Sequence, residues 1–316
     1  MHEIVILSGK GGTGKTTLTG AFVQLASNPV ICDLDVDAPD LHMLLHPENE
    51  SSHDFFSGHE AVIDPDRCTG CGLCADLCRF HAVQSQDAVF SINPIKCEGC
   101  KVCVAFCPEK AIDFPESHCG TWHTASTRFG PMIHAQLFPG AENSGKLVAL
   151  LRQHARELAQ ARGLDLVVSD GPPGIGCPVI SSLSGAGSAL LITEPTPSGV
   201  HDLKRVSELC RHFHIPAAII INKSDLNPGI TREIKDWCAK KEWSLAGEIP
   251  YDAAATRAMV DGKVLPEFLP SDSALLGTLR DVWKRVEGLI EAKRAAWAFV
   301  SAIQAFSEKE RQRVER

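Results

Sequence analysis

The sequence has no apolar run long enough to cross a bilayer, and no charged segment leading into an apolar one as in secretory signals. It also has no excess of positive charge, because 31 Lys and Arg residues stand against 39 Asp and Glu, a formal net charge of −8. These absences argue against a membrane-spanning or secreted protein and against general affinity for nucleic acid or anionic membranes. We therefore expect a cytoplasmic protein that binds no nucleic acid and does not act at a membrane.

Tyrosine and methionine are scarce, with one Tyr and four Met in 316 residues. The hydrophobic core must therefore be built mainly from Val, Ile, Leu, Ala and Phe. Cysteine, by contrast, is frequent, with 13 residues. Cytoplasmic thiols stay reduced, so this number favours metal ligands over disulfides.

The segment that organises the chain lies near its start. An apolar run, residues 4–8, leads into a glycine-rich turn and then into a helix-compatible segment, residues 18–26. The turn has the pattern G-x-x-x-x-G-K-[ST], in which glycines let backbone N–H groups approach phosphate oxygens. Lys15 would reach the β- and γ-phosphates, and the Thr16 hydroxyl would bind Mg²⁺. The predicted phosphate-binding residues are Gly9, Lys10, Gly11, Gly12, Thr13, Gly14, Lys15, Thr16 and Thr17.

Lys10 makes the loop K-G-G-T-G-K-T-T, which resembles the MinD/ParA group of P-loop ATPases, whose deviant loop carries a second, "signature" lysine. The resemblance implies a mostly parallel α/β sheet and an ATP-dependent dimer, either with a second copy or with a related ATPase. It also implies that Lys10 acts in trans, on the phosphates held by the partner. A solvated lysine on an exposed loop is the alternative interpretation.

Four aspartates follow the next apolar strand, residues 30–32, and like charges at one strand end need a cation or another reason to be there. By resemblance, Asp35 orients the attacking water and Asp33 supports Mg²⁺. Asp37 is the alternative for the water-orienting role. A solvated acidic turn remains a third interpretation.

A further buried-type strand, residues 164–169, ends in Asp170, the arrangement that holds Mg²⁺ in P-loop proteins. The Gly/Pro turn after it resembles the family's switch loop. In that loop Gly171 and Gly174 would let the backbone approach the γ-phosphate and move when that phosphate leaves.

Two more apolar strands, residues 189–193 and 217–221, are expected in the same sheet. By resemblance, Asn222 reads the adenine edge and Pro250 lines the base. The sequence N-K-x-D at residues 222–225 is also typical of guanine recognition. GTP therefore stays open, although the phosphate loop favours ATP.

The composition changes near residue 60, where two C-x2-C-x2-C-x3-C runs form an internal repeat with the bacterial ferredoxin pattern. In that pattern the fourth cysteine of each run binds the other cluster. One [4Fe–4S] cluster would then be held by Cys68, Cys71, Cys74 and Cys107. The second would be held by Cys97, Cys100, Cys103 and Cys78. Zinc is the alternative metal, because C-x2-C pairs also bind it.

Two segments are less informative. Residues 117–146 are predicted to be a loop or linker, in which His118, Cys119 and His123 could form a metal site but are more typical of a surface loop. The C-terminal part, residues 272–316, is predicted to be helical. One helix face should pack on the sheet through Leu275, Leu279, Val282, Val286, Leu289 and Ile290. Its last stretch, with Trp297 and Phe299, is expected to pack within the chain or on a partner rather than on a membrane.

The whole pattern resembles MinD-superfamily ATPases with an inserted ferredoxin domain. We expect a discontinuous ATPase domain, residues 1–60 and 117–316, and an inserted domain with two [4Fe–4S] clusters, residues 61–116. The leading hypothesis is an ATP-hydrolysing dimeric switch that gates electron transfer to or from a redox protein. The alternative is an ATPase that carries or assembles clusters for an acceptor protein. The third is a spatial positioning factor with redox sensing.

Overall fold

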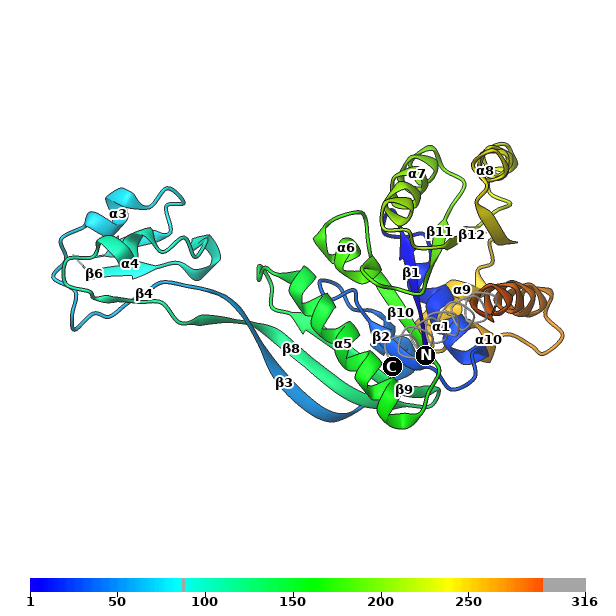
Figure 1. Cartoon of the computed structure of the whole chain (residues 1–316), viewed down its shortest axis with the longest axis horizontal. Helices are drawn as coiled ribbons and strands as arrows, with labels where there is room; N and C mark the ends of the chain where they lie inside the picture. The colour runs from blue at the N-terminus through cyan, green and yellow to red at the C-terminus, as the bar shows by residue number, and fades with distance from the viewer. Residues whose placement is uncertain (87–88, 292–316) are drawn as a thin grey trace, which may run out of the picture.

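The computed structural model describes residues 1–86 and 89–291 and is organised around a nine-stranded sheet (Figure 1). The strand order is β13-β12-β11-β1-β10-β2-β9-β8-β3. All neighbours from β13 to β9 run parallel, and the predicted mostly parallel α/β sheet is confirmed. Besides β9, the strands of this parallel part are β1 (His2–Ser8), β2 (Val30–Asp33), β10 (Leu166–Pro173), β11 (Ser188–Thr193), β12 (Ala217–Asn222) and β13 (Ser244–Ile249).

Helices cover both faces of the parallel part, which explains why its strands are apolar throughout rather than alternating. The helices of this body are α1 (Lys15–Leu25), α2 (Leu41–Leu45), α5 (Ser144–Arg162), α6 (Cys177–Leu183), α7 (Pro197–His212), α8 (Pro228–Lys241), α9 (Ala254–Val260), α10 (Leu265–Phe268) and a helix over 274–291. Their starts follow local chemistry. Thr196 and Asn227 accept hydrogen bonds from Gly199 N and Ile230 N at the beginnings of α7 and α8.

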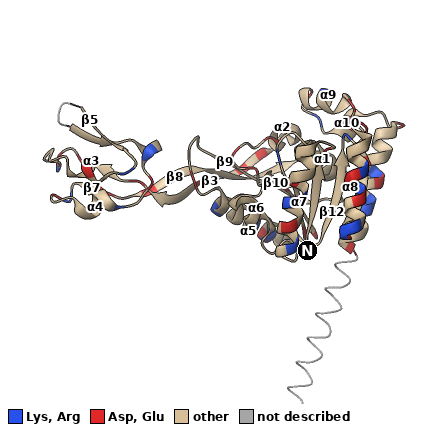
Figure 2. Ribbon diagram, turned by 90° about the horizontal axis from the view of Figure 1, so that it is seen from above, with Lys and Arg blue, Asp and Glu red and all other residues tan. Residues whose placement is uncertain are grey.

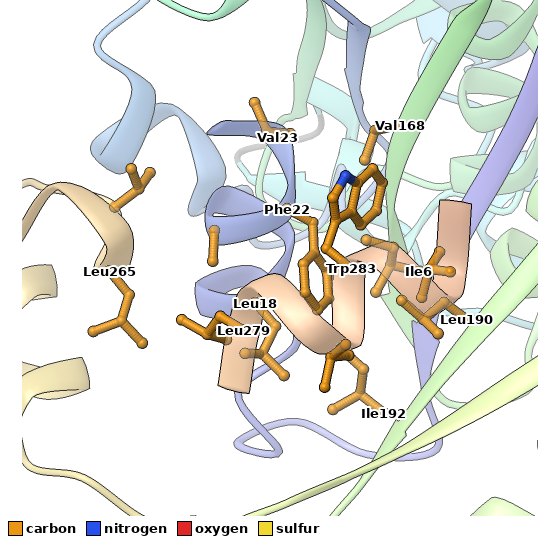
Figure 3. Packing of buried hydrophobic residues seen from close by; sticks show 14 of the residues in the cluster. Ile6, Leu18, Phe22, Val23, Val168, Leu190, Ile192, Leu265, Leu279 and Trp283 are labelled. Atoms are coloured by element: carbon orange, nitrogen blue, oxygen red, sulfur yellow. The ribbon is translucent and has the colours of Figure 1, made fainter. Parts of the chain in front are cut away.

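The C-terminal helix packs where the sequence predicted, on α1 and the central strands (Figure 3). The rings of Phe22 and Trp283 stack at 5.3 Å between centroids in that core. Five of the six predicted face residues are buried: Leu275, Leu279, Val282, Val286 and Ile290. Leu289 is 40% exposed, so its assignment to the buried face was wrong. Trp297 and Phe299 lie outside the described residues.

The sheet continues beyond β2 as an antiparallel extension that the sequence did not predict. Strands β8 (Glu116–Thr127) and β9 (Gly130–Leu137) form a hairpin, and β3 (Glu48–His59) pairs with β8 at the outer edge. The prediction of a loop over residues 117–146 was therefore wrong. Its Thr, Ser and His residues satisfy their backbone groups in the ladder, and only one side of β8 packs on apolar residues such as Trp122.

A small lobe, residues 60–115, stands at the far end of the β3–β8 pair, away from the helix-covered body (Figures 1 and 2). It contains β4 (Val62–Ile63) paired with β7 (Ile112–Asp113), and β5 (Val83–Gln86) paired with β6 (Val89–Ile92). It also contains α3 (Leu73–Leu77), a short 3-10 turn (Pro94–Lys96) and α4 (Val102–Phe106). The lobe does not follow the acidic loop directly, since α2 and β3 intervene.

No helix among the described residues is both long enough and apolar enough to span a bilayer.

Candidate functional site

The glycine-rich loop joins β1 to α1 at the carboxyl edge of the parallel sheet, where such folds bind ligands. Gly12 and Gly14 have φ of 80° and 88°, a left-handed conformation that favours glycine. A Cβ on Gly14 would lie 2.4 Å from Asn222 Nδ2, while Gly11 and Gly12 face open space. The loop is thus tight against the protein on one side and free to approach a ligand on the other.

The lysine and hydroxyl of the loop meet the predicted Mg²⁺ ligand. Lys15 Nζ lies 2.9 Å from Asp170 Oδ2 and 3.6 Å from Asp35 Oδ2. Thr16 Oγ1 donates to Asp170 Oδ2 at 2.8 Å, and Thr19 Oγ1 donates to Asp170 Oδ1 at 2.6 Å. The structure therefore brings together side chains from three distant parts of the sequence, namely the start of α1, Asp35 and Asp170.

Strand pairing explains why two aspartates meet at this point. β10 and β2 run parallel in a register that sets Asp170 beside Asp33, and both carboxyls are buried. Asp33 Oδ2 is buried without a hydrogen-bond partner, and so is Thr13 Oγ1 in the loop. Buried polar atoms normally have partners, so these two atoms fit a bound cation and a bound phosphate. The residues present thus suit Mg²⁺ and a nucleotide.

Burial and crowding change the acidity of these groups. Burial, and then the neighbouring Asp170, raise the pKa of Asp33 well above its ordinary value. Burial also raises the pKa of Asp35 to about 6, although Lys15 opposes the change. Burial alone would lower the pKa of Lys15, but Asp170 and Asp35 outweigh it and the pKa is raised. A divalent cation would relieve the repulsion among the carboxylates.

Asp35→Asn is expected to stabilise the nucleotide-free protein by about 1–2 kcal/mol above about pH 6, and the gain should vanish below about pH 4. The folded pKa of Asp35 is raised, so the wild-type carboxyl costs nothing below its unfolded pKa. Its cost then grows as pH rises through about 6, and stability falls over that window. Urea unfolding with a chelator at several pH values measures the difference. Asp37→Asn, at an exposed neighbour, is the matched control, and a gain independent of pH would contradict the assignment.

Of the two candidates for orienting water, Asp35 faces Lys15, whereas Asp37 is exposed. The loop after β10 also lies at this site. Gly174, with φ of 91°, donates from its N–H to Ser8 O at 2.9 Å. A Cβ on Gly171 would lie 2.5 Å from Leu7 Cδ2, so only glycine fits this close approach.

Asn222 lies beside the phosphate loop, at the end of β12. Its amide Nδ2 donates to Thr13 O at 2.8 Å, so the NH2 group supports the loop. Pro250 follows β13 at the same edge of the sheet and is exposed. The structure thus places Asn222 against the phosphate loop, with its NH2 group already used, and Pro250 at the carboxyl end of β13, which is separated from β1 by β12 and β11.

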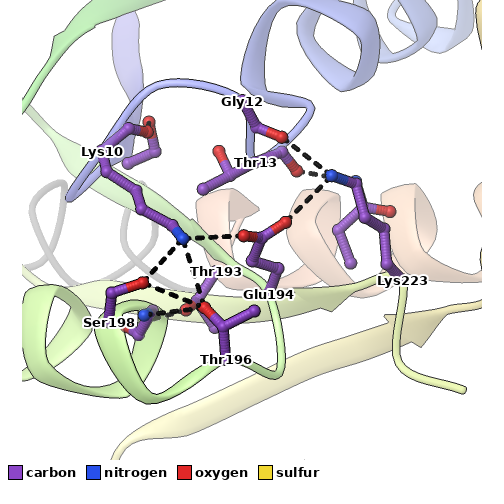
Figure 4. Close-up of polar contacts among 11 residues, drawn as sticks. Lys10, Gly12, Thr13, Thr193, Glu194, Thr196, Ser198 and Lys223 are labelled. Atoms are coloured by element: carbon purple, nitrogen blue, oxygen red, sulfur yellow. Dashed lines mark hydrogen bonds and ion pairs between the residues drawn. The ribbon is translucent and has the colours of Figure 1, made fainter. Parts of the chain in front are cut away.

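Two polar residues of this edge were missed by the sequence reasoning, namely Glu194 after β11 and Lys223 after β12 (Figure 4). Glu194 forms ion pairs with Lys10 at 2.8 Å and with Lys223 at 2.9 Å. The available signal was a carboxylate directly after a buried strand, the same signal that identified Asp33 and Asp170.

In the small lobe, one cavity is lined by Cys68, Cys71, Cys74 and Cys107, the four residues predicted to share a cluster. The two cysteine runs also have matching backbones. Gly70 and Gly72 have positive φ in the first run, and Gly99 and Lys101 have positive φ in the second. The tight turns of the repeat are therefore built twice.

In the second run, Cys97 and Cys100 lie close enough to Cys103 to act on it electrostatically, and so does Cys74 of the first run. Backbone N–H groups point at the fourth cysteine of each run. Ala82 N lies 3.4 Å from Cys78 Sγ, and Ala111 N lies 3.3 Å from Cys107 Sγ. Burial would raise the pKa of Cys78, but hydrogen bonds from backbone N–H groups of residues 80–83 outweigh it and lower the pKa, which favours the thiolate. Across residues 1–86 and 89–291, no three Cys, His, Asp or Glu side chains gather closely enough to hold a single metal ion.

The alternative metal site in β8 does not form. Cys119 is buried and its Sγ donates to Ser57 O at 3.1 Å, while His118 contacts Asp54 and Gly120 O. His123 instead contacts Ser52 Oγ at 2.9 Å. Each of the three side chains thus has a different partner, and we conclude that they serve the hairpin rather than a metal.

Comparison with known proteins agrees with this geometry. A family model described as the CobQ/CobB/MinD/ParA nucleotide binding domain matches residues 4–265. An uncharacterised protein of Methanocaldococcus jannaschii, MJ0578, is 35% identical over 228 residues, which cover 71% of this chain and 79% of that protein. The cytosolic Fe-S cluster assembly factor Nubp1 homolog of Drosophila grimshawi is 24% identical over 289 residues, covering 83% of this chain and 75% of the relative.

Among solved structures, the septum site-determining protein MinD of Pyrococcus horikoshii, complexed with Mg-ADP, has a TM-score of 0.55 and 16% identity. The likeness covers 92% of this chain and 98% of that one, and at this identity it shows the fold alone.

Proposed function

Because the chain belongs to the CobQ/CobB/MinD/ParA nucleotide-binding family, we propose that it is an ATP-hydrolysing dimeric switch carrying two [4Fe–4S] clusters, which gates electron transfer with a redox protein. The observation that carries the proposal is the continuity of one sheet. The phosphate loop and the acidic site lie at the carboxyl ends of its parallel strands, and β3 and β8 extend the sheet to the cysteine lobe.

The nucleotide chemistry follows from the charges at the site. Lys15 would bind the β- and γ-phosphates, and Thr16 and Asp170 would hold Mg²⁺ with support from Asp33. Asp35 orients the attacking water, and its raised pKa suits transient proton acceptance. Lys10 completes the site of a second copy. ATP is the proposed nucleotide because the phosphate loop has the sequence K-G-G-T-G-K-T-T.

Residues 61–116 form the proposed cluster domain. The shared cavity supports assigning Cys107 to the cluster of the first run, and by the same exchange Cys78 belongs to the second. When bound, each cluster supplies one-electron redox chemistry. A single zinc ion needs four ligands gathered round one point, whereas a four-iron cluster takes one thiolate on each iron. The repeated C-x2-C-x2-C-x3-C spacing and the cavity shared by four cysteines of the two runs favour the cluster.

A packed route connects the nucleotide loop to the lobe. Helix α6 begins directly after the loop that follows β10, residues 174–176, and packs on α5. Buried Arg152 of α5 donates to Ser181 O and Ser184 O of α6, at 2.6 and 2.7 Å, and pairs with Glu3. The start of α5 lies against Gly58 of β3, near the root of the lobe. Movement of the nucleotide loop would therefore carry α6 and α5 together against the hairpin.

The test is an anaerobic, EPR-monitored redox titration of the whole protein without nucleotide, with MgADP and with a non-hydrolysable ATP analogue. A shift of about 60 mV, roughly 1.4 kcal/mol for one electron, is expected between the ADP and ATP-analogue states. Such a shift means that nucleotide and electron bind with linked free energies.

Arg152→Lys provides the comparison variant, because lysine keeps the charge but cannot bond both α6 carbonyls and Glu3 at once. The shift should become smaller in this variant while nucleotide affinity stays the same. Identical potentials in all nucleotide states of the wild type would exclude thermodynamic gating.

The Nubp1 relative favours a second candidate, a carrier that delivers clusters to an acceptor protein. The two functions differ in what leaves the protein. An electron-transfer protein keeps its clusters through repeated reduction and oxidation, whereas a carrier loses iron to an acceptor apoprotein when ATP is present. Iron content of both proteins after incubation and separation distinguishes the two.

A further inference from the structure

Lys10 belongs to the phosphate loop, but its ammonium group is bound by residues that follow β11. Its Nζ lies 2.8 Å from Glu194 Oε1, 2.8 Å from Ser198 Oγ and 3.2 Å from Thr196 Oγ1 (Figure 4). The turn after β11 and the first turn of α7 thus supply three oxygen acceptors to one ammonium group. Lys10 remains 29% exposed, so the group is held but is not enclosed.

Glu194 forms ion pairs with two lysines, one in the phosphate loop and one directly after β12. Its Oε2 pairs with Lys223 Nζ at 2.9 Å, and the same ammonium donates to Gly12 O at 2.8 Å. Lys223 thereby fixes one carbonyl of the phosphate loop, as Asn222 fixes the next one at Thr13. A carbonyl held outward turns the following N–H to the opposite side, which is where phosphate oxygens would lie.

We propose that Glu194 is a positioning residue that stores Lys10 against its own chain and ties its release to the phosphate loop through Lys223 and Gly12. This inference rests on the proposed role of Lys10 in trans. A stored Lys10 cannot reach the phosphates of a second copy, so part of the free energy of pairing is spent in breaking its contacts with Glu194.

Charge balance makes the release possible. When Lys10 leaves, Glu194 keeps Lys223 as its partner, and no carboxylate is left unpaired. Burial would raise the pKa of Glu194, but hydrogen bonds from Lys10 and Lys223 outweigh it and lower the pKa. The carboxylate therefore stays ionised near neutral pH, and the storage contact is present whenever the chain is alone.

The test is Glu194→Gln in the full-length protein. With a non-hydrolysable ATP analogue, half-maximal dimerisation measured by sedimentation or light scattering is expected at a protein concentration lower by about fivefold, because a neutral amide holds Lys10 less well. MgADP affinity should change by less than about twofold, because Lys223 still donates to Gly12 O. Glu248→Gln is the matched control, since Glu248 pairs with Lys235 in another part of the protein.

Unchanged or weaker dimerisation of Glu194→Gln would overturn the proposal. So would a loss of MgADP affinity of about tenfold, which would mean that Glu194 only supports the loop. Failure of the underlying function has a different signature, because Lys10→Ala would then dimerise as the wild type does. If both proposals hold, Lys10→Ala/Glu194→Gln behaves as Lys10→Ala alone.

Discussion

Lys15→Ala is expected to abolish MgATP binding and also to destabilise the nucleotide-free chain by about 3–5 kcal/mol. The side chain is buried among Asp170, Asp35 and Asp33, and two of these carboxyls are themselves buried. Without Lys15 no positive side chain of the site balances them, and repulsion among buried carboxylates is costly. Urea unfolding with a chelator and titration with a labelled nucleotide measure the two losses separately.

Two variants sharpen this result. Asp33→Asn should be at least as stable as the wild type without nucleotide, because it removes a carboxylate whose pKa is already raised by burial and by the neighbouring Asp170. Lys240→Ala, at an exposed position of α8, should change stability by less than about 0.5 kcal/mol. If Lys15→Ala unfolds no more easily than Lys240→Ala, then the acidic site does not depend on Lys15 for its charge balance.

The parallel part of the fold could be predicted because each strand is both apolar and ended by a polar signal. β1 leads into the glycine-rich loop, β2 ends at Asp33, and β10 carries Asp170, although β10 continues to Pro173 rather than ending at the aspartate as predicted. Parallel strands bring such ends to one edge, so local patterns were enough to assemble most of the acidic site. The contacts of Lys15 with Asp170 and Asp35 are the outcome of that rule.

The hairpin could not be predicted in this way, because the side chains of β8 carry no clear alternation. Trp122 packs toward the core, while Thr124 and His123 are only partly buried. The strand exists because β3 and β9 satisfy its backbone on both sides. Such pairing depends on residues distant in sequence, and no local propensity records it.

The contacts of Glu194 were missed for a related reason. A carboxylate after β11 is visible in the sequence, but its two lysine partners come from the loop after β1 and from the end of β12. Strand order places β11 between β1 and β12, so the bridge follows from topology. Knowing that order beforehand would have turned Glu194 into a candidate.

Cys107→Ser is expected to remove the cluster of the first cysteine run although Cys107 belongs to the second. The reason is that Cys68, Cys71, Cys74 and Cys107 line one cavity. Each iron of a cluster held there would be bound by one of these four thiolates, and the substitution would leave one iron without its thiolate. Anaerobically prepared protein should contain about four iron atoms per chain instead of about eight. Cys78→Ser should give the same iron content but retain the other EPR signal.

Cys119→Ser is the matched control, because the buried thiol of Cys119 contacts Ser57 O and does not line the cavity of Cys68, Cys71, Cys74 and Cys107. It should keep the iron content of the wild type. Loss of all iron in Cys107→Ser but none in Cys78→Ser would contradict the exchanged assignment.

The combined Cys78→Ser/Cys107→Ser variant should lose the folded lobe while the ATPase body keeps its own unfolding transition. Among the residues of the lobe that the structure describes, few apolar side chains are buried, namely Ala61, Ala82, Ala111 and Ile112, so the lobe has little core of its own. The three large hydrophobic clusters are built from the body and the hairpin instead. Limited proteolysis should therefore cut the variant within residues 60–115 and leave MgATP binding intact. Protease resistance of the lobe without iron would show that its fold needs no cluster.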